Sequence, residues 1–305
     1  MVRILITGAC GAIGTALLDH LEDTDYEVIG VDKNTADREH DYHVQQHDLT
    51  KGQPLPAADV IVHLAAHSQV QPLIEKPQLA VENVETTERV LRHASDQNAT
   101  VILASSREVY GSAVRPTEQS IDVEATNPYG ASKIASEAFT SAYERCFDVD
   151  VITLRFANVY GPYDSNPRVI PIFVTLGLDG EELTVFDDSK ILDFVYMGDV
   201  VEMLEYAVDH RESLVGSTIN IGSGTGTSLS TLAEHIVDLI DDCPGYRIEG
   251  NRQGDTKKYV ANIEKARALL DHDPTPLQKG LPRTIDWYRD QDEVRSTIKE
   301  HLASD

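Results

Sequence analysis

A tyrosine and a lysine one helical turn apart, Tyr129 and Lys133, are the residues of this chain best suited to proton transfer. Residues four apart on a helix share one face, and Pro128 is a residue type that suits a first helical turn. A free tyrosine titrates at a pH of about 10, but a neighbouring ammonium stabilises the phenolate. The spacing therefore predicts a general base that works near neutral pH, although such a pair also occurs on ordinary surface helices.

Two serines at the end of an apolar run add a second polar group to this pair. The run 100–104 is followed by Ser105 and Ser106, and parallel sheets place their ligands at the carboxyl ends of the strands. A hydroxyl there can share a hydrogen bond with a substrate oxygen and with the phenol. Serines also end many ordinary strands, so the pair supports the prediction without deciding it.

Three glycines directly after the apolar run 2–6 indicate where a nucleotide would bind. Gly8 permits a tight turn, Gly11 lets the backbone approach phosphate oxygens, and Gly14 lets the next helix pack against the strand. Asp32 lies 18 residues beyond Gly14, where a carboxylate accepts the adenosine ribose diol and repels a 2′-phosphate. The pattern predicts an NAD site rather than an NADP site; the alternative is an ordinary glycine-rich turn.

Short β-branched runs alternate with segments of helical length through the first half of the chain. This alternation is typical of a parallel sheet with helices on both faces. The expected strands are 2–6, 26–32, 43–47, 59–64, 100–105 and 149–155. The expected helices lie near 12–23, 78–97 and 129–147. The sequence therefore predicts the α/β class, with a Rossmann-type doubly wound parallel sheet.

The pattern changes after about residue 160, where prolines interrupt a loop. Further elements are expected near 170–178 (helix), 183–186 (strand), 199–209 (helix) and 217–222 (strand), and the last dozen residues are expected to form a solvent-exposed helix that frays. These features predict a smaller, helix-rich substrate-binding lobe. The expected division is 1–164 plus about 193–224 for an NAD-binding domain, and about 165–192 plus 225–305 for the lobe.

The chain is strongly acidic, with 51 acidic and 26 basic residues and a formal net charge of −25. A nucleic-acid partner requires a cationic surface, so the composition argues against one. Such charge destabilises a fold through self-repulsion unless salt screens it. We therefore expect adaptation to a high-salt cytosol, the alternative being a merely acidic protein of an ordinary cell.

Three cysteines, Cys10, Cys146 and Cys243, form neither an even set nor a metal-binding spacing, which suits a reducing compartment. The first expected strand begins at the second residue, which leaves no room for a signal peptide. No apolar stretch reaches membrane-spanning length. The expectation is a cytoplasmic protein with no membrane partner.

The order and spacing of the polar motifs resemble the NAD-dependent nucleotide-sugar epimerase/dehydratase branch of the extended short-chain dehydrogenase/reductase family. The resemblance covers nearly the whole chain. Besides the glycines, Asp32 and the Tyr129/Lys133 pair, it is carried by Asp48–Leu49, His63–Ala66, Asn83, Ser106 with Tyr110–Gly111, Arg155–Pro162, Asp193–Tyr196, Asp199–Val200, Asn220–Gly222 and Arg252–Asp255.

The resemblance implies roles for individual residues. Ser106, Tyr129 and Lys133 would be catalytic. The NAD site would contain Tyr129 and Lys133 together with Gly8, Gly11, Ala12, Ile13, Gly14, Asp32, Asp48, Leu49, Leu64, Ala65, Ala66 and Asn83. Substrate contacts would come from Ser106, Glu108, Asn158 and Arg252. The implied reaction is epimerisation at C4 of a nucleotide sugar, of the UDP-glucose/UDP-galactose type, through a transient 4-keto sugar. A homodimer formed through helices 78–97 and 129–147 is also implied.

Two departures from the family pattern leave other reactions open. Leu192 stands where members usually carry an arginine that binds the diphosphate, which admits a dehydrogenase acting on a free sugar or uronate. Arg107 stands where dehydratases carry an aspartic acid, which argues against 4,6-dehydration. Glu108 falls at the position of an active-site glutamate of dehydratases and decarboxylases. Instead of taking part in catalysis, Glu108 could equally form a structural ion pair with Arg107.

The remaining candidates are assigned smaller roles. His63 and His67 flank Ala65 and Ala66 without a third metal ligand in view, so no metal is expected. His63 is interpreted as a strand residue, whereas His67 could touch substrate. The aromatic pair 287–288 is interpreted as part of the core.

Overall fold

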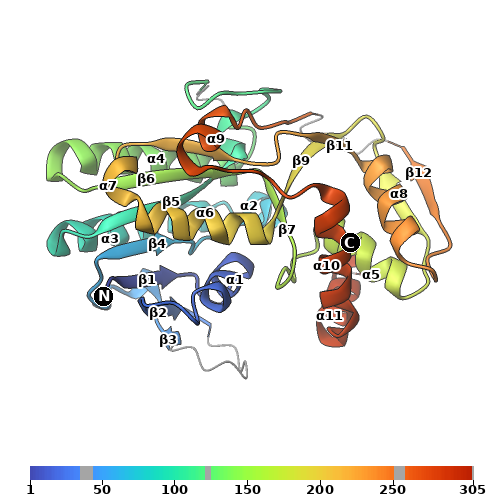
Figure 1. Ribbon diagram of the computed structural model, residues 1–305, viewed down its shortest axis with the longest axis horizontal. Coiled ribbons are helices and arrows are strands. Elements are labelled where there is room, and N and C mark those ends of the chain that lie inside the picture. The colour runs from blue at the N-terminus through green and yellow to red at the C-terminus, as the bar shows by residue number, and fades with distance from the viewer. Residues whose placement is uncertain (35–43, 121–124, 251–257, 304–305) are drawn as a thin grey trace.

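The computed structural model describes residues 1–34, 44–120, 125–250 and 258–303. Its main sheet has seven strands, and every neighbouring pair runs parallel. From one edge to the other they are β10 (Thr218–Ile221), β6 (Val151–Phe156), β5 (Thr100–Ser106), β4 (Val60–His63), β1 (Arg3–Thr7), β2 (Glu27–Asp32) and β3 (Val44–Gln46) (Figure 1). The predicted doubly wound α/β fold is confirmed.

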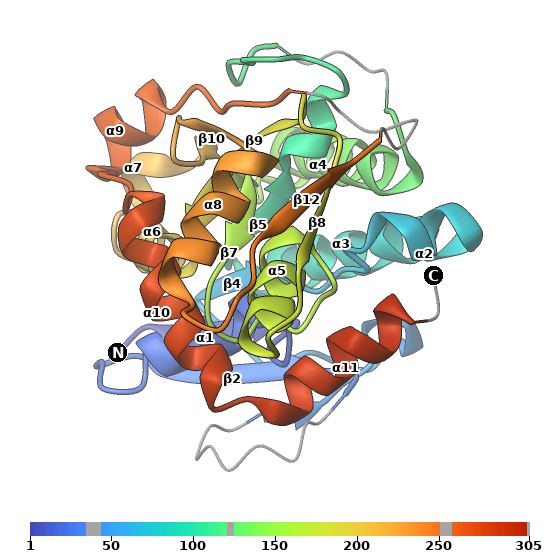
Figure 2. The same ribbon diagram turned by 90° about the vertical axis from the view of Figure 1, so that its right-hand side faces the viewer.

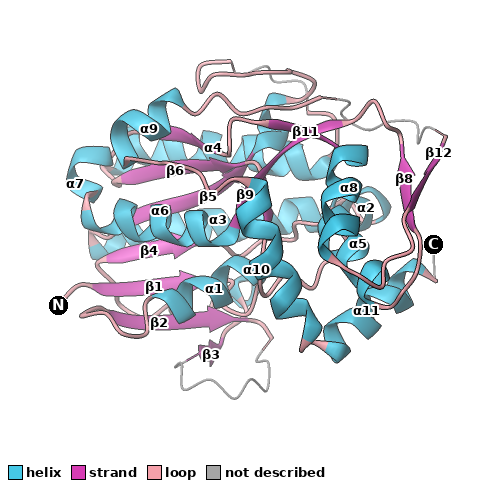
Figure 3. Cartoon of the chain, turned by 45° about the vertical axis from the view of Figure 1, so that its right-hand side comes forward, coloured by secondary structure: helices cyan, strands magenta, loops and turns pink. Residues whose placement is uncertain are grey.

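Helices cover both faces of this sheet because successive strand residues point to opposite sides. Ile4 and Ile6 pack on the side of α1 and α6, whereas Leu5 packs on the side of α3. Figure 3 shows α1 and α6 over one face of the sheet. These and the other helices of this half are α1 (Ala12–His20), α2 (Val70–Glu75), α3 (Gln78–Gln97), α4 (Pro128–Phe147), α6 (Met197–Asp209), α7 (Arg211–Leu214) and α9 (Glu264–Leu270).

A second hydrophobic core lies beyond the carboxyl ends of the main strands (Figure 1). It is built on a three-stranded sheet and a parallel two-stranded ribbon. Their strands are β7 (Asn158–Tyr160), β9 (Ile191–Tyr196) and β11 (Gly226–Ser228), then β8 (Leu183–Phe186) and β12 (Tyr246–Glu249). The helices packed on them are α5 (Val169–Leu178), α8 (Leu229–Leu239), α10 (Leu277–Arg289) and α11 (Asp292–Leu302). The division into two domains stays a prediction, which this second core supports.

The expected final helix is present as α11 and is largely exposed, but one side of it is docked on the protein. Helix α11 packs against α5, as Figure 2 shows, and its Ile298 is fully buried. Lys299 lies 2.8 Å from an oxygen of Asp179 and 2.7 Å from one of Glu181. Ile298, the partly buried Val294 and Leu302, and the ion pairs of Lys299 hold the helix in place.

Several elements differ from expectation in smaller ways. Helix α1 ends at His20 rather than near residue 23, and the sequence did not predict α2, β7, β9, β11 or β12. The pair expected in the core is partly confirmed, because Tyr288 is fully buried while Trp287 packs half-buried against it. None of the described helices has the length and apolar character to cross a membrane.

Candidate active site

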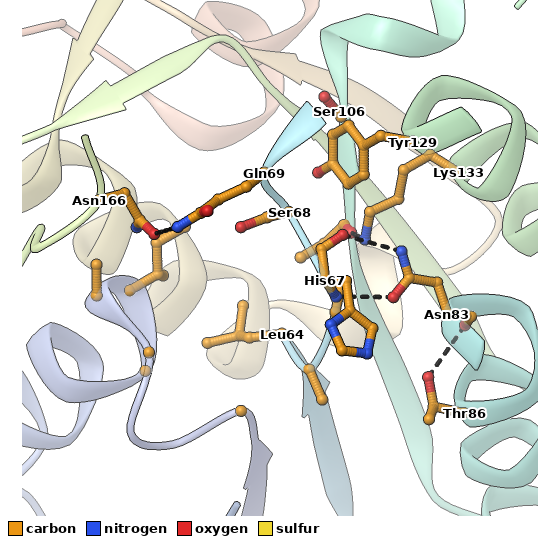
Figure 4. Close-up of a pocket in the computed structure, with 18 of the residues that line it drawn as sticks. Leu64, His67, Ser68, Gln69, Asn83, Thr86, Ser106, Tyr129, Lys133 and Asn166 are labelled. Atoms are coloured by element: carbon orange, nitrogen blue, oxygen red, sulfur yellow. Dashed lines mark hydrogen bonds between the residues drawn. The ribbon is translucent and has the colours of Figure 1, made fainter. Parts of the chain in front are cut away.

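A cavity of about 770 Å³ opens at the carboxyl ends of the main strands (Figure 4). The structure brings all the predicted site residues but one to its wall. These are Gly8, Gly11, Ala12, Ile13, Gly14, Asp32, Asp48, Leu49, Leu64, Ala65, Ala66, Asn83, Ser106, Glu108, Tyr129, Lys133 and Asn158. The exception, Arg252, lies outside the described residues.

The glycine loop forms a cradle that side chains would fill. Gly8 has a φ of +73°, and a Cβ there would lie 2.7 Å from the backbone nitrogen of Ala65. A Cβ on Gly14 would collide with the carbonyl oxygen of Gly8. Gly11 is the N-cap of α1 and offers no side-chain acceptor, so the first N–H groups of the helix stay available to an anion. The loop therefore fits the pyrophosphate of a dinucleotide.

Asp32 fixes this loop and retains capacity for a ligand. One carboxylate oxygen accepts from the backbone N–H of Cys10 at 3.1 Å, and the other from that of Asn34 at 3.0 Å. An ionised carboxylate has roughly four acceptor positions, so a ribose diol can still donate to it. At the far end, Asp48 caps a short 3₁₀ turn, and hydrogen bonds from Thr50 lower its pKa to about 2.

The predicted catalytic residues meet on one wall. Asn127 caps α4 by accepting from the Gly130 N–H at 2.8 Å, which places Tyr129 in the first turn. The Lys133 ammonium lies 5.8 Å from the centre of the Tyr129 ring and donates to the Ala104 carbonyl at 2.7 Å. Ser106, the last residue of β5, lies on the same wall, as Figure 4 shows.

Burial is the largest influence on the pKa values of both Tyr129 and Lys133. Burial raises the pKa of Tyr129 to about 12, and a hydrogen bond with Ser106 opposes this rise only in part. Burial also lowers the pKa of Lys133 to about 8, against the opposing charge of Glu137. The Lys133 ammonium lies over the Tyr129 ring and donates one of its three N–H groups to the Ala104 carbonyl.

A buried ion pair supports this wall from behind. Arg155 is fully buried and donates to both carboxylate oxygens of Glu137, at 2.9 and 2.6 Å. Glu137 lies one turn beyond Lys133 on α4 and also accepts from the Ser105 hydroxyl. Arg155 further donates to the Tyr110 hydroxyl at 2.8 Å. This network fixes α4 against β5 and β6.

Glu108 is held by its neighbours at the edge of the cavity. One oxygen lies 2.9 Å from the Arg107 guanidinium, and the other accepts from the Asn127 amide at 2.8 Å. Arg107 also lies over the ring of Tyr259, 5.4 Å from its centre. Of the two interpretations left open by the sequence, the geometry supports pairing with Arg107.

Asn83 reaches the wall of the cavity in a supporting position. The Asn83 side-chain oxygen accepts from the backbone N–H of His67 at 2.7 Å. The Asn83 side-chain NH2 donates to the backbone carbonyl of His67 at 3.0 Å and to the Ser132 hydroxyl. It therefore clamps the loop after β4, as Figure 4 shows. The His67 ring pairs with Glu82 at 3.0 Å. His63 lies in the sheet between two threonine hydroxyls, and burial lowers its pKa to about 3, in line with a strand role.

Gln69, Asn166 and Arg168 are among the polar wall residues that sequence reasoning missed. Gln69 donates to Asn166 at 2.7 Å across the cavity (Figure 4). Arg168 directly precedes α5, and its guanidinium lies 2.7 Å from the buried carboxylate of Asp164. The available signal was their place in loops that follow strand ends, because such loops line the ligand sites of parallel sheets.

Asn158 and Leu192 differ in what they can offer a substrate. Asn158 lines the cavity while its amide donates to the Asp193 carbonyl at 2.8 Å. Leu192 is 5% exposed and packs in the second core. Leu192 therefore offers the cavity no polar contact. Within the described ranges, no cluster of three or more histidine, cysteine or acidic residues could hold a metal ion.

The sequence profile of the NAD dependent epimerase/dehydratase family matches residues 4–222. The chain belongs to this family. NAD is therefore its cofactor, and the glycine cradle and Asp32 fit that nucleotide.

Individual relatives span nearly the whole chain. The UDP-glucose 4-epimerase of Mycolicibacterium smegmatis is 28% identical, over 95% of this chain and 99% of its own length. The dTDP-glucose 4,6-dehydratase 1 of Escherichia coli is 28% identical, over 94% and 92%. Among solved structures, the UDP-glucose 4-epimerase of Thermotoga maritima with UDP-glucose superposes with a TM-score of 0.87 and 26% identity, over 95% and 99% of the two chains. The protein is thus an enzyme of the epimerase/dehydratase type.

Proposed function

We propose that the protein epimerises a nucleotide sugar at C4, through a transient 4-keto sugar, with UDP-glucose and UDP-galactose as the reference substrate pair. One observation carries the proposal. The phenol of Tyr129, the hydroxyl of Ser106 and the ammonium of Lys133 share a wall of the same cavity that holds the glycine cradle. The similarity to a UDP-glucose 4-epimerase over nearly the full length supports it.

In this proposal each residue has a defined task. The glycine loop and Asp32 hold the pyrophosphate and ribose of NAD, while Tyr129 accepts the proton of the sugar 4-hydroxyl and Ser106 orients that oxygen. Because the pKa of Tyr129 is raised to about 12, the phenol requires a further positive charge beside it. Oxidised NAD supplies that charge, together with the hydride acceptor. Asn158 and Arg252 are assigned to the substrate.

The decisive experiment incubates the purified protein with UDP-glucose and catalytic NAD. Conversion to the C4 epimer, followed by NMR, without stoichiometric absorbance at 340 nm supports the proposal. The Tyr129→Phe variant is the matched control, since it removes only the phenolic oxygen. Epimer formation by that variant at the wild-type rate would contradict the assignment of the base.

Net oxidation is the second candidate, and Leu192 is the observation that favours it. Its side chain lies in the core rather than on the cavity wall, so one expected phosphate contact is missing and a smaller substrate becomes possible. Stoichiometric NADH formation from a free sugar or uronate would establish this reaction. Elimination of water or release of carbon dioxide would instead identify the dehydratase or decarboxylase reaction, which the bonding of both Glu108 oxygens argues against.

We further propose a homodimer formed through α3 and α4. Both helices carry exposed apolar side chains, with Val81 58%, Phe139 41% and Phe147 57% exposed. Burial of such side chains stabilises association. Light scattering on the purified protein should give twice the chain mass, and a monomer at micromolar concentration would contradict the proposal.

A further inference from the structure

His63 is a buried histidine that takes no part in the proposed reaction. It is the last residue of β4 and lies beside Thr7, the last residue of β1, in the parallel sheet. Its Nδ1 lies 2.8 Å from the Thr7 hydroxyl, and its Nε2 lies 3.2 Å from the Thr87 hydroxyl on α3. The ring therefore joins the strand that leads into the glycine loop to a helix that covers the sheet.

The Thr7 hydroxyl also supports the wall of the NAD site. Thr7 directly precedes Gly8, and its hydroxyl accepts from the backbone N–H of Ala65 at 3.3 Å. The same backbone nitrogen is the atom that a Cβ on Gly8 would approach to 2.7 Å. The loops after β1 and β4 are thus in contact with no room for a side chain between them. A small shift of either loop would change the shape of the cradle.

The Thr87 hydroxyl connects the ring to the catalytic helix. It donates to the Asn83 carbonyl at 2.9 Å and lies 3.0 Å from the Ser136 hydroxyl on α4. Ser136 lies three residues beyond Lys133, on the next turn of that helix. A continuous series of polar contacts therefore runs from the glycine cradle to the helix that carries Tyr129 and Lys133.

The pattern of donors assigns the tautomer of His63. Thr7, His63, Thr87 and Ser136 are all buried, and buried polar groups are nearly always hydrogen-bonded. Because the Thr87 proton goes to the Asn83 carbonyl, Thr87 accepts from Nε2–H, and Nδ1 is left to accept from Thr7. The opposite tautomer would leave the Thr7 hydroxyl proton facing an N–H group. Burial lowers the pKa of His63 to about 3, so the ring is neutral and offers one donor and one acceptor.

We propose that His63, as the neutral Nε2–H tautomer, is a positioning residue that fixes the glycine cradle relative to the helix carrying Tyr129 and Lys133. The inference concerns the NAD site, and it rests on the proposed function only where turnover is the readout. A misplacement of about 1 Å between reacting groups can lower a rate by about 10²-fold. Loss of the His63 contacts should therefore affect both NAD affinity and kcat.

The first test reads the tautomer in the unmodified protein. Long-range proton–nitrogen NMR spectra of protein labelled with ¹⁵N-histidine distinguish a protonated ring nitrogen from a bare one at pH 7. The chain has 11 histidines, and the His63 signal is the one that disappears in His63→Gln. It should show a bare Nδ1 and a protonated Nε2. A protonated Nδ1, or a doubly protonated ring, would overturn the inference.

The second test measures NAD affinity by calorimetry on nucleotide-free protein. His63→Leu removes both hydrogen bonds and should weaken NAD binding by about 10-fold. His63→Gln should recover most of that loss, because an amide again offers an acceptor and a donor on one planar group. Thr87→Val keeps the ring but removes the Nε2 acceptor, and should also weaken NAD binding, even if His63→Leu folds poorly. The matched control is His93→Leu, which removes a histidine bonded to the Pro56 carbonyl outside the cavity and should leave NAD affinity unchanged.

Turnover separates positioning from a merely structural role. At saturating NAD, His63→Leu should lower kcat for epimerisation of UDP-glucose by about 10²-fold with little change in KM. Unchanged NAD affinity and kcat in the folded variant, or no recovery in His63→Gln, would overturn the inference alone. If wild type does not epimerise UDP-glucose, the proposed function fails, while the tautomer and the NAD affinities still decide the role of His63.

Discussion

Replacing Lys133 by methionine should stabilise the folded protein at pH 7 while abolishing turnover. The side chain is 6% exposed, and burial lowers its pKa from 10.5 to about 8. A shift of that size corresponds to about 3 kcal/mol lost by the charged folded state. Methionine removes this cost but also the hydrogen bond to Ala104, whose loss costs about 1 kcal/mol. Because Arg155 still neutralises Glu137, the net gain is about 1–2 kcal/mol.

The gain in free energy of unfolding that Lys133→Met provides should shrink as the pH rises. Between pH 8 and 10.5 the folded wild type binds fewer protons than its unfolded chain, so its free energy of unfolding increases with pH across that window. The advantage of Lys133→Met should therefore fall by about 2 kcal/mol between pH 7 and pH 10.

Urea denaturation of nucleotide-free protein at both pH values measures this difference. Lys265→Met is the matched control, because Lys265 is half-buried and also donates to a backbone carbonyl, that of Thr218, at 2.7 Å. The free energy of unfolding of the Lys265→Met variant should be about 1 kcal/mol lower than that of wild type at either pH. A Lys133→Met protein that is less stable than wild type by the same amount at pH 7 and pH 10 would refute the reasoning.

Three further outcomes are expected. Tyr129→Phe should lower kcat by about 10²–10⁴-fold with NAD binding retained, measured by turnover and by fluorescence titration; loss of NAD binding would point to a structural role instead. Gly14→Ala should weaken NAD binding by about 10-fold or more, or destabilise the fold by about 1–3 kcal/mol, because the new Cβ collides with the Gly8 carbonyl. The control is Gly250→Ala, which has open space around it and should change neither NAD binding nor stability. Activity and Tm should rise from low salt to multimolar KCl because salt screens the −25 net charge; a maximum at low salt would remove the halophilic interpretation.

The main sheet could be predicted because its strands are buried on both faces. Such strands are buried at every position and consist mostly of apolar residues, as in Val60–His63 and Val151–Phe156. The small sheet of the second lobe gave no such signal. Its central strand carries Asp193, a fully buried carboxylate that accepts from Ser223 and from the backbone N–H of Ala261. A polar residue at the middle of a short strand hides the strand from pattern analysis.

The composition of the site was predictable, but its electrostatics were not. Motif spacing identifies Ser106, Tyr129 and Lys133 because each stands at a fixed distance from a strand end or helix start. The pKa of the phenol depends on its burial and on its hydrogen bond with Ser106, and both are set by tertiary packing. The polar bridge between Gln69 and Asn166 joins loops 97 residues apart, so no local pattern could reveal it.

The docking of the last helix has a consequence for synthesis. Ile298 completes a core whose other buried members begin at Tyr160, so that core stays incomplete until α11 has left the ribosome. By contrast, six of the seven strands of the main sheet, β1 to β6, are complete by residue 156 and can assemble early. A nascent chain halted before residue 292 would expose the apolar surface that α11 normally covers, and chaperones and proteases could bind there.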